Sequence, residues 1–565
     1  MKYNNELEPQ KSIFIPGSIN ILKEEDVGES GFSGQIQRNK KGIILMPQPS
    51  SSPNDPLNWS KTRKYWHFFL MCFVTGLTAA ISNDAGAAQD SLNEIYGISY
   101  DAMNTGAGVL FLFIGWSCIF LAPASSLYGR RITYLICLLA GTLGSVWFAK
   151  SRRTSDTIWS QAFVGLSEAC AEAQVQQSLS DIFFQHNLGS VLTAYIMATS
   201  IGTFLGPLIA QYISDNTSFR WVGWWGAIIT GATLIVFIFG CEETVFDREA
   251  AYARDNTIVT HKGEASTANV NEYSLKKESS RAQVSPYDES SSGESVDDNN
   301  RALNSSEAPK SYTDNVALIT PASYLEGWGF KQYVKRFFLY FKIFTFPAVW
   351  LSGMLWGLQD AYLSFYLTTE EDYFPDAPWN YSGNAVGIMN VATLVGAVIG
   401  CLVAGILSDY HVMWMAKKKN GVYEPEYRLW LSFITLIISP VGLIMFGVGA
   451  ERQWPKSVIY IGLGFIGYGW GTIGDISMSY LMESYPKIVI LGMVGVSIIN
   501  NSLGSIFTFV CSYWLDSSGT ANTYIALAVI DFVTIACAIP TIYWGKSWRK
   551  RTTKAYLELV ELGLS

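Results

Sequence analysis

Residues 111–141 read FLFIGWSCIFLAPASSLYGRRITYLICLLAG, which is two apolar runs joined by a short turn with adjacent arginines. The complete runs cover residues 103–123 and 131–149. Each is close to the length of about 20 residues that a helix needs to cross a bilayer. Arg130 and Arg131 mark the turn as a segment that stays in water on one side of the membrane. The stretch therefore predicts a transmembrane helical hairpin.

The same pattern recurs in two blocks of six apolar runs. The first block covers residues 66–86, 103–123, 131–149, 157–181, 189–213 and 221–241, and the second covers 344–367, 385–408, 428–449, 457–482, 488–514 and 522–544. We expect an all-α integral membrane protein with twelve transmembrane helices in two six-helix bundles. The expected domains are an N-terminal tail at 1–64, a first bundle at 65–244, a linker at 245–343, a second bundle at 344–545 and a C-terminal tail at 546–565.

The predicted linker is polar and contains SSSGESVDDNN at residues 290–300. Few apolar residues and many serines and aspartates are typical of a disordered segment. Its end, FKQYVKRFFLYFK at 330–342, mixes aromatic residues with lysine and arginine. This pattern predicts an amphipathic helix that lies on the membrane surface.

The composition agrees with a membrane protein and excludes several other classes. Hydrophobic residues make up 49% of the chain and charged residues 15%, whereas a soluble globular protein has about 25% charged residues. The net charge of −8 argues against nucleic acid as a partner. The eight cysteines and four histidines are scattered without a CxxC pair or a histidine cluster, so we expect no metal site and no cofactor. No phosphate-binding GxxxxGK[ST] loop occurs, so we expect neither ATP-driven transport nor an enzyme.

Lysine and arginine residues gather on one side of the predicted membrane. An even number of spans puts both termini on that side, together with KTRK at 61–64, the Arg130–Arg131 turn, KKK at 417–419 and RKRTTK at 549–554. The opposite loops, such as 89–101 and EEDYFPD at 370–376, are acidic, although Lys150, Arg152 and Arg153 are an exception. Because positive loops remain cytoplasmic, we expect both termini in the cytoplasm. The sequons at Asn216 and Asn380 then lie outside, where glycosylation occurs, and the acidic face attracts cations.

Three motifs identify a family. APASSLYGRR at 122–131 and GILSDY at 405–410 occupy equivalent turns of the two blocks, and GTFLGPLIA at 202–210 lies in the fifth run. The paired turns resemble the loop signature of the major facilitator superfamily, and GTFLGP is similar to the GxxxGP motif of its drug:proton antiporter branch. In the first turn Ser126 stands where aspartate is usual and Leu127 where arginine is usual. The second turn keeps Asp409 but lacks the basic cluster that follows. We therefore expect charge locking by these loops to differ from the family in detail.

Longer strings narrow the resemblance, which covers residues from about 55 to 545. SPNDPLNWS, SNDAGAAQDSLNEIYGISYD, SDIFFQH, FRWVGW and NTYIALAVI are similar to the fungal permeases of this branch that carry polyamines and histidinol. The resemblance implies uptake of organic cations at the plasma membrane, with spermidine, spermine, putrescine and histidinol as substrates. We expect a monomer that works by alternating access and is coupled to protons.

GLSEACAEAQ at 165–174 places Glu168 and Glu172 inside the fourth predicted span. A carboxylate in the membrane costs about 3 kcal/mol and is typical of a functional site. Glu168 lies about 16 Å along the span, and Glu172 follows one turn later on the same face. No lysine or arginine occurs at that depth in the twelve runs, so we expect these residues to bind a cation or a proton. The alternative is a carboxyl group that pairs with a buried base or stays protonated. In this branch an arginine usually stands where this chain has Gln161.

Other acidic residues occur inside predicted spans. Asp360 lies in the seventh span and Asp84 near the outer end of the first, and the symmetry of the family makes these two spans equivalent. We expect Asp360 to bind substrate, and Asp84 and Asp475 to couple protons or gate the pathway. The alternatives are a helix-terminal residue that reaches water for Asp84 and a helix-end residue for Asp475. Asp531 has no evident function, and we expect it to form an interhelical hydrogen bond.

Aromatic and amide side chains complete the expected site. The faces of Trp356 and Tyr362 attract ammonium groups by about 0.5–2 kcal/mol, and the Asn500 carbonyl oxygen accepts hydrogen bonds from them. The alternative is ordinary packing between helices. A drug-efflux antiporter and a sensor that binds without transporting are the other functions that this sequence leaves open.

Overall fold

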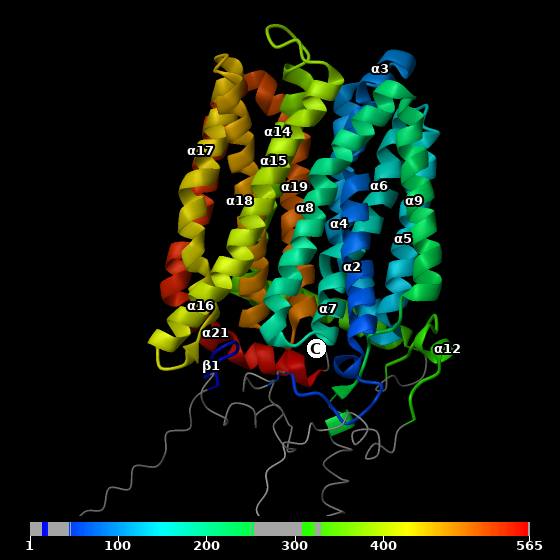
Figure 1. Cartoon of the computed structure of the whole chain (residues 1–565), viewed down its shortest axis with the longest axis vertical. Coiled ribbons are helices and arrows are strands. Elements are labelled where there is room, and N and C mark those ends of the chain that lie inside the picture. The colour runs from blue at the N-terminus through cyan, green and yellow to red at the C-terminus, as the bar shows by residue number, and fades with distance from the viewer. Residues whose placement is uncertain are drawn as a thin grey trace, which may run out of the picture.

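The computed structural model describes residues 14–20, 45, 47–248, 250–252, 308–322 and 329–562. Most of the predicted linker lies outside the described residues. The chain forms a bundle of roughly parallel helices (Figure 1). The helices of the first half are α2 (Lys61–Ser82), α4 (Tyr100–Tyr128), α5 (Arg130–Ala149), α6 (Thr154–Cys170), α7 (Gln176–Ile182), α8 (Gln185–Asn216) and α9 (Phe219–Gly240). A π-helical turn at Ala171–Val175 joins α6 to α7, so the two form one passage.

The second half repeats this arrangement. Its helices are α14 (Pro347–Tyr373), α15 (Gly383–Leu402), α16 (Ser408–Lys418), α17 (Ser432–Glu451), α18 (Lys456–Ser484), α19 (Val489–Ser518) and α20 (Thr520–Ala536), followed by α21 (Ala538–Glu561). A second π-helical turn, Val403–Leu407, joins α15 to α16. The short helices α3 (Gln89–Tyr96), α12 (Tyr312–Asn315) and α13 (Phe330–Tyr340) lie outside the twelve passages.

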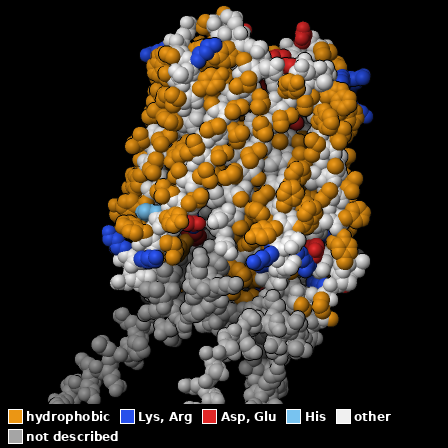
Figure 2. Space-filling view, viewed as in Figure 1, with side chains coloured by type: hydrophobic (Ala, Val, Ile, Leu, Met, Phe, Trp, Pro, Cys, Tyr) orange, Lys and Arg blue, Asp and Glu red, His pale blue; other side chains and the backbone are white. Residues whose placement is uncertain are grey.

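The surface of the bundle is apolar over its middle. In Figure 2 hydrophobic side chains cover the visible face, and lysine and arginine lie toward its two ends. Nine of the described helices are long and apolar enough to cross a membrane, or ten if the bent pair α13–α14 counts as one span. The passages α6–α7 and α18 complete the predicted twelve. They carry the intramembrane carboxylates Glu168, Glu172 and Asp475.

Helices pack where glycine leaves room for a neighbouring backbone. The GTFLGP motif lies in α8 against α2: a Cβ atom on Gly202 would lie 2.1 Å from the Gly76 carbonyl oxygen, and one on Gly206 would lie 2.8 Å from the Ala80 backbone. Small residues at this spacing let membrane helices approach closely. Between the halves, α4 packs on α19 and α8 packs on α15. The carboxylates of the candidate site lie between these two contacts.

Both tails lie at one end of the bundle, which we call the tail end (lower end in Figure 1). Strand β1 (Ile19–Asn20) of the N-terminal tail pairs with β2 (Val422–Tyr423) in the α16–α17 loop. The Arg549 guanidinium of α21 donates to the Pro16 carbonyl oxygen and to Ser18 Oγ. Ser18 Oγ in turn donates to Glu424 Oε2 at 2.6 Å. Residues 14–20 are therefore bound to the second half.

The predicted helix at the end of the linker is present as α13. Residues Phe330–Thr345 are bent by 84° from α14, so α13 runs across the bundle axis at the tail end. Its aromatic side chains contact α4: the Phe337 ring packs on Phe120 with centroids 5.1 Å apart, and the Tyr333 hydroxyl donates to the Phe120 carbonyl oxygen. Phe330 and Phe338 remain exposed, as expected of a helix that faces lipid headgroups.

Candidate functional site

Three carboxylates from the two halves meet inside the bundle. Glu168 lies in α6, Glu172 in the π-helical turn that follows, and Asp360 in α14. Each lies within electrostatic range of the other two. Asp360 is buried, whereas both glutamates are more exposed than the residues next to them in the chain. Because all three lie between packed helices, this exposed surface faces an internal space.

No base neutralises these carboxylates. Within the described part of the chain none of the three forms an ion pair, and the charges that act on them are those of one another. No group of three histidine, cysteine, aspartate or glutamate side chains in that part is placed to hold a metal ion. The three carboxylates therefore do not converge on one point, and they suit separate cationic groups better than a single ion.

Aromatic rings surround Asp360. The Trp470 indole Nε1 donates to Asp360 Oδ1 at 2.8 Å. The Trp470 ring packs against Trp356, with centroids 4.8 Å apart, and against Phe204 of the first half, with centroids 5.5 Å apart. The Asn500 amide of α19 lies beside the same carboxylate. Asp360 is thus held in place by one indole, inside a cluster of buried aromatic rings.

The π-helical turn that carries Glu172 is held by side chains from its own passage and from α8. The Tyr195 hydroxyl donates to the Ala171 carbonyl oxygen at 2.9 Å. Gln176 Nε2 donates to the Glu172 carbonyl oxygen and to the Tyr195 hydroxyl, both at 3.2 Å. A π-helical turn inside an α-helix is often found at a functional site. Here it sets the direction of Glu172, whose Oε2 has no hydrogen-bond partner among the described residues.

A pocket, which we call the vestibule, lies between the two halves, toward the end of the bundle opposite the tails. Its polar side chains come from both halves and include Ser82, Asn104, Gln161, Ser364, Glu371 and Thr508. The Ser82 hydroxyl also faces the Glu168 carboxylate. Ser82 therefore links the wall of the vestibule to the carboxylate site.

The two halves touch at the tail end. Thr193 Oγ1 of α8 donates to Asp475 Oδ2 of α18 at 3.1 Å, and Ser479 Oγ donates to Asp475 Oδ1. Gly189 of α8 lies so close to Asp409 that a Cβ atom there would be 2.8 Å from Asp409 Oδ2. These contacts close the tail end below the carboxylate site.

An ion-pair network holds the tail end of the second half. The Arg428 guanidinium donates to Asp409 Oδ1 at 2.8 Å, to Glu483 Oε1 at 2.6 Å and to Ser408 Oγ at 3.0 Å. Arg428 comes from the chain that leads into α17, whereas its partners come from α16 and α18. One guanidinium thus replaces the missing basic cluster of the GILSDY turn.

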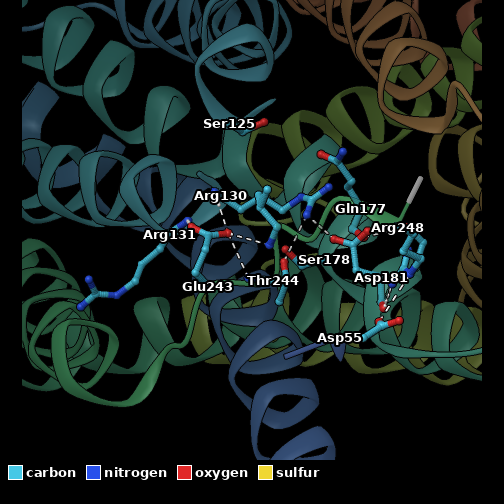
Figure 3. A network of polar contacts seen from close by, with 12 residues as sticks. Asp55, Ser125, Arg130, Arg131, Gln177, Ser178, Asp181, Glu243, Thr244 and Arg248 are labelled. Atoms are coloured by element: carbon cyan, nitrogen blue, oxygen red, sulfur yellow. Dashed lines mark hydrogen bonds and ion pairs between the residues drawn. The ribbon is translucent and has the colours of Figure 1, made fainter. Parts of the chain in front are cut away.

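Figure 3 shows the corresponding network of the first half. Arg130 at the start of α5 forms an ion pair with Asp181 at the end of α7. The backbone N–H groups of Arg130 and Arg131 donate to the Glu243 carboxylate, both at 3.1 Å. The APASSLYGRR turn is therefore locked by charge although Ser126 stands where aspartate is usual, because α7 and the segment after α9 supply the carboxylates.

The remaining predicted residues lie around the site rather than in it. Asp84 lies two residues after the end of α2 and directly before the short helix Ala85–Ala88, next to residues that line the vestibule. Tyr362 lies within electrostatic range of Asp531, away from the three carboxylates. Asp531 Oδ1 accepts a hydrogen bond from Gln359 Nε2 of α14 at 2.9 Å, which confirms the predicted interhelical hydrogen bond.

One prediction about the loops is wrong. Glu370 was expected in an acidic loop, but it lies in α14 and is 1% exposed. Its Oε2 accepts a hydrogen bond from Asn390 Nδ2 at 3.1 Å, and Asn390 Oδ1 accepts one from the Tyr366 hydroxyl. The helix continues to Tyr373 because no glycine or proline interrupts it before Pro375, and the residue before a proline disfavours helical geometry.

Sequence analysis did not identify Tyr195, Gln176, Glu371 and Arg428 as parts of the site. The run QVQQ at 174–177 was the available signal for Gln176, because glutamines inside a predicted span need polar partners. Tyr195 and Arg428 gave no such signal, since their partners lie on other passages.

Comparison with known proteins identifies the family. The sequence profile of the Major Facilitator Superfamily matches residues 68–509. The chain belongs to the major facilitator superfamily. It is 54% identical to Protein HOL1 of Saccharomyces cerevisiae, over 99% of both chains. It is also 49% identical to an uncharacterized MFS-type transporter of Schizosaccharomyces pombe, over 96% of this chain and 94% of that one. The protein is therefore a multi-pass membrane transporter of this superfamily, as the loop and GTFLGP motifs predict.

Solved structures of the superfamily share the fold. The proton:xylose symporter XylE aligns with a TM-score of 0.55 over 86% of this chain and 97% of its own, at 12% identity. The human organic anion transporter MFSD10 aligns with a TM-score of 0.51 over 84% and 99% of the two chains, also at 12% identity. At such low identity the likeness extends to the fold and not to the substrate.

Proposed function

We propose that this transporter takes up polyamines and related organic cations, among them spermidine, spermine, putrescine and histidinol, across the plasma membrane. The observation that carries the proposal is the group of Glu168, Glu172 and Asp360, which lie together inside the bundle with no ion pair to a base among the residues that the structure describes. Burying an unpaired charge is costly, and a carboxylate forms short, strong hydrogen bonds with an ammonium group. A substrate with several amines supplies the missing positive charges at several points.

The aromatic surroundings support a cationic substrate over a neutral drug. Trp470 occupies one oxygen of Asp360, and the rings of Trp356 and Trp470 lie next to it. Ring faces attract desolvated ammonium groups by about 2 kcal/mol, and they also pack against the methylene chains between amines. A site for neutral compounds has no need of three carboxylates.

In the proposed mechanism the two halves rock about the carboxylate site. The tail end is cytoplasmic, as the placement of basic residues predicts, and the vestibule faces outside. A polyamine passes through the vestibule and pairs with the carboxylates. The contacts of Asp475 with Thr193 and of Asp409 with Gly189 then separate, and the substrate leaves at the tail end. Carboxylates in these surroundings take up protons after the amines depart, which couples transport to protons.

Uptake of labelled spermidine tests the proposal. Cells without their own polyamine permease would express the wild-type chain, Glu168→Gln, Glu172→Gln or Asp360→Asn at matched surface abundance. Asp531→Asn is the matched control, because it also removes a buried membrane carboxylate but lies outside the site. We expect uptake by the wild type and the control, and a large loss in the three site variants.

Two results would contradict the proposal. Unchanged uptake in all three site variants would show that these carboxylates do not bind the substrate or its coupling proton. Absence of uptake by the wild-type chain, together with export of organic cations from preloaded cells, would favour a drug-efflux antiporter.

A further inference from the structure

A mostly polar stripe runs along one face of α14 from Asp360 toward the end of the bundle opposite the tails. Asp360 lies at its lower end, and Ser364, Leu367, Thr368 and Glu371 follow; these four line the vestibule. The spacing of four, seven, eight and eleven residues from Asp360 keeps them on one face of a helix. Asp360 therefore lies one helical turn from Ser364 in the vestibule wall, on the helix face that carries Glu371.

Helix geometry fixes the distance between these carboxylates. Asp360 and Glu371 are separated by eleven residues, which correspond to about 16 Å along the axis and a rotation of only about 20° beyond three full turns. A fully extended chain of carbon and nitrogen atoms advances about 1.2 Å per bond. The terminal amines of spermine, a linear tetraamine, are therefore about 16 Å apart, and those of the triamine spermidine about 11 Å.

Glu371 is positioned to interact with a cation. Its carboxylate lies against Gly86 of the first half, where a Cβ atom would be 2.2 Å from Glu371 Oε1. The charges that act on it are those of Asp372 and Asp90, both negative. Within the described residues it has no ion pair with a base. Glu371 therefore faces the vestibule from one half while it touches the other half.

The space between the two carboxylates contains a second sign of a ligand. Gln161 lines the vestibule, is 4% exposed and has no hydrogen-bond partner among the described residues. Its amide is therefore free to bond to a molecule in the vestibule. Its carbonyl oxygen would accept a hydrogen bond from an amine in the middle of a bound chain, and Ser364, which accepts from Thr508 Oγ1, adds a further polar group.

We propose that the vestibule is a second ammonium subsite, in which Glu371 binds the far amine of a linear tetraamine while its near amine pairs with Asp360. The inference rests on the proposed function and adds a chain-length preference to it. A diamine occupies the carboxylate site alone. A triamine falls about 5 Å short of Glu371, so the subsite favours the longest of these substrates.

The test compares substrates of different length in one set of variants. Half-saturating concentrations for uptake of spermine and of putrescine would be measured with the wild type, Glu371→Gln and Asp372→Asn. Asp372→Asn is the matched control, because this substitution also removes a negative charge. The Asp372 side chain is adjacent to Glu371 in the chain but is exposed and does not line the vestibule. We expect Glu371→Gln to raise the half-saturating concentration for spermine about tenfold or more, with little change for putrescine. Asp372→Asn should change neither.

Retained putrescine uptake by Glu371→Gln shows that this variant folds and that the proposed function holds. If Glu371→Gln carries neither substrate, Gly86→Ala provides the second variant, because its methyl group displaces the Glu371 side chain without removing a charge. A selective loss of spermine affinity in Gly86→Ala supports the subsite. Equal changes for both substrates, or no change for spermine, would overturn it. A wild-type chain that carries neither amine would instead refute the proposed function, and the subsite with it.

Discussion

Replacement of Tyr195 by phenylalanine removes a single oxygen atom and tests whether the π-helical turn directs Glu172. The hydroxyl donates to the Ala171 carbonyl oxygen at 2.9 Å and accepts from Gln176 Nε2 at 3.2 Å. Without it the buried Ala171 carbonyl oxygen loses a hydrogen bond, at a cost of about 1–3 kcal/mol. If the whole cost destabilises the conformation that binds the cation, the half-saturating concentration of spermidine for uptake rises by about 5- to 150-fold.

The assay is uptake of labelled spermidine, normalised to the amount of protein at the cell surface. Tyr134→Phe is the matched control. Its hydroxyl lies 2.7 Å from Ser178 Oγ between α5 and α7 and is equally buried, but it does not contact the π-helical turn. We expect Tyr134→Phe to keep the half-saturating concentration of the wild type. The reasoning is refuted if Tyr195→Phe and Tyr134→Phe behave alike.

Three further predictions concern packing, ion pairs and pH. Gly202→Ala places a Cβ atom 2.1 Å from a backbone oxygen of α2 and should destabilise the protein by about 1–3 kcal/mol. Thermal unfolding in detergent should show a lower unfolding temperature for this variant. The control Gly231→Ala should match the wild type, because the atom nearest to its new Cβ is 3.6 Å away. Arg428→Ala leaves two carboxylates without the base that pairs with them, which loosens the α16–α17 loop. Limited proteolysis should therefore cleave this loop faster in Arg428→Ala than in Arg452→Ala, which changes an exposed arginine. Equal rates of cleavage would contradict the role of the network. Burial raises the pKa of Glu424, but hydrogen bonds from Lys546, Ser18 and Arg549 outweigh it and hold the pKa below its usual value. Docking of residues 14–20 is therefore stabilised above the pKa of a free glutamate and weakens as the pH falls through the lower pKa of the docked one. Hydrogen exchange of these residues should show that dependence in the wild type and not in Glu424→Gln.

The fold follows from features that a sequence displays directly. Apolar runs of bilayer length and basic turns such as Arg130–Arg131 predict the helices, because in lipid every backbone polar group must be satisfied within a helix. The symmetry of the two blocks also brings Asp360 into the same region as Glu168 and Glu172. The expectation that these carboxylates share one cavity also needed the arrangement of helices that the family resemblance implies, because periodicity gives only the face of each helix.

The details of the site depend on contacts between passages, which the local pattern does not contain. Tyr195 bonds to a carbonyl oxygen 24 residues away, and Arg428 pairs with Glu483 55 residues away. The π-helical turn is a deviation of the backbone that ordinary periodicity does not reveal. Glu370 was misplaced for a related reason, because a run of acidic residues is typical of a loop although α14 extends through it.

Calorimetric titration of spermidine into the purified protein tests the central claim most directly, namely that Glu168, Glu172 and Asp360 together form a cation site. The three proteins to compare are the wild type, the triple variant Glu168→Gln/Glu172→Gln/Asp360→Asn and the control Asp531→Asn. The account predicts that the wild type and Asp531→Asn bind spermidine and that the triple variant does not. Equal binding by all three proteins would contradict it.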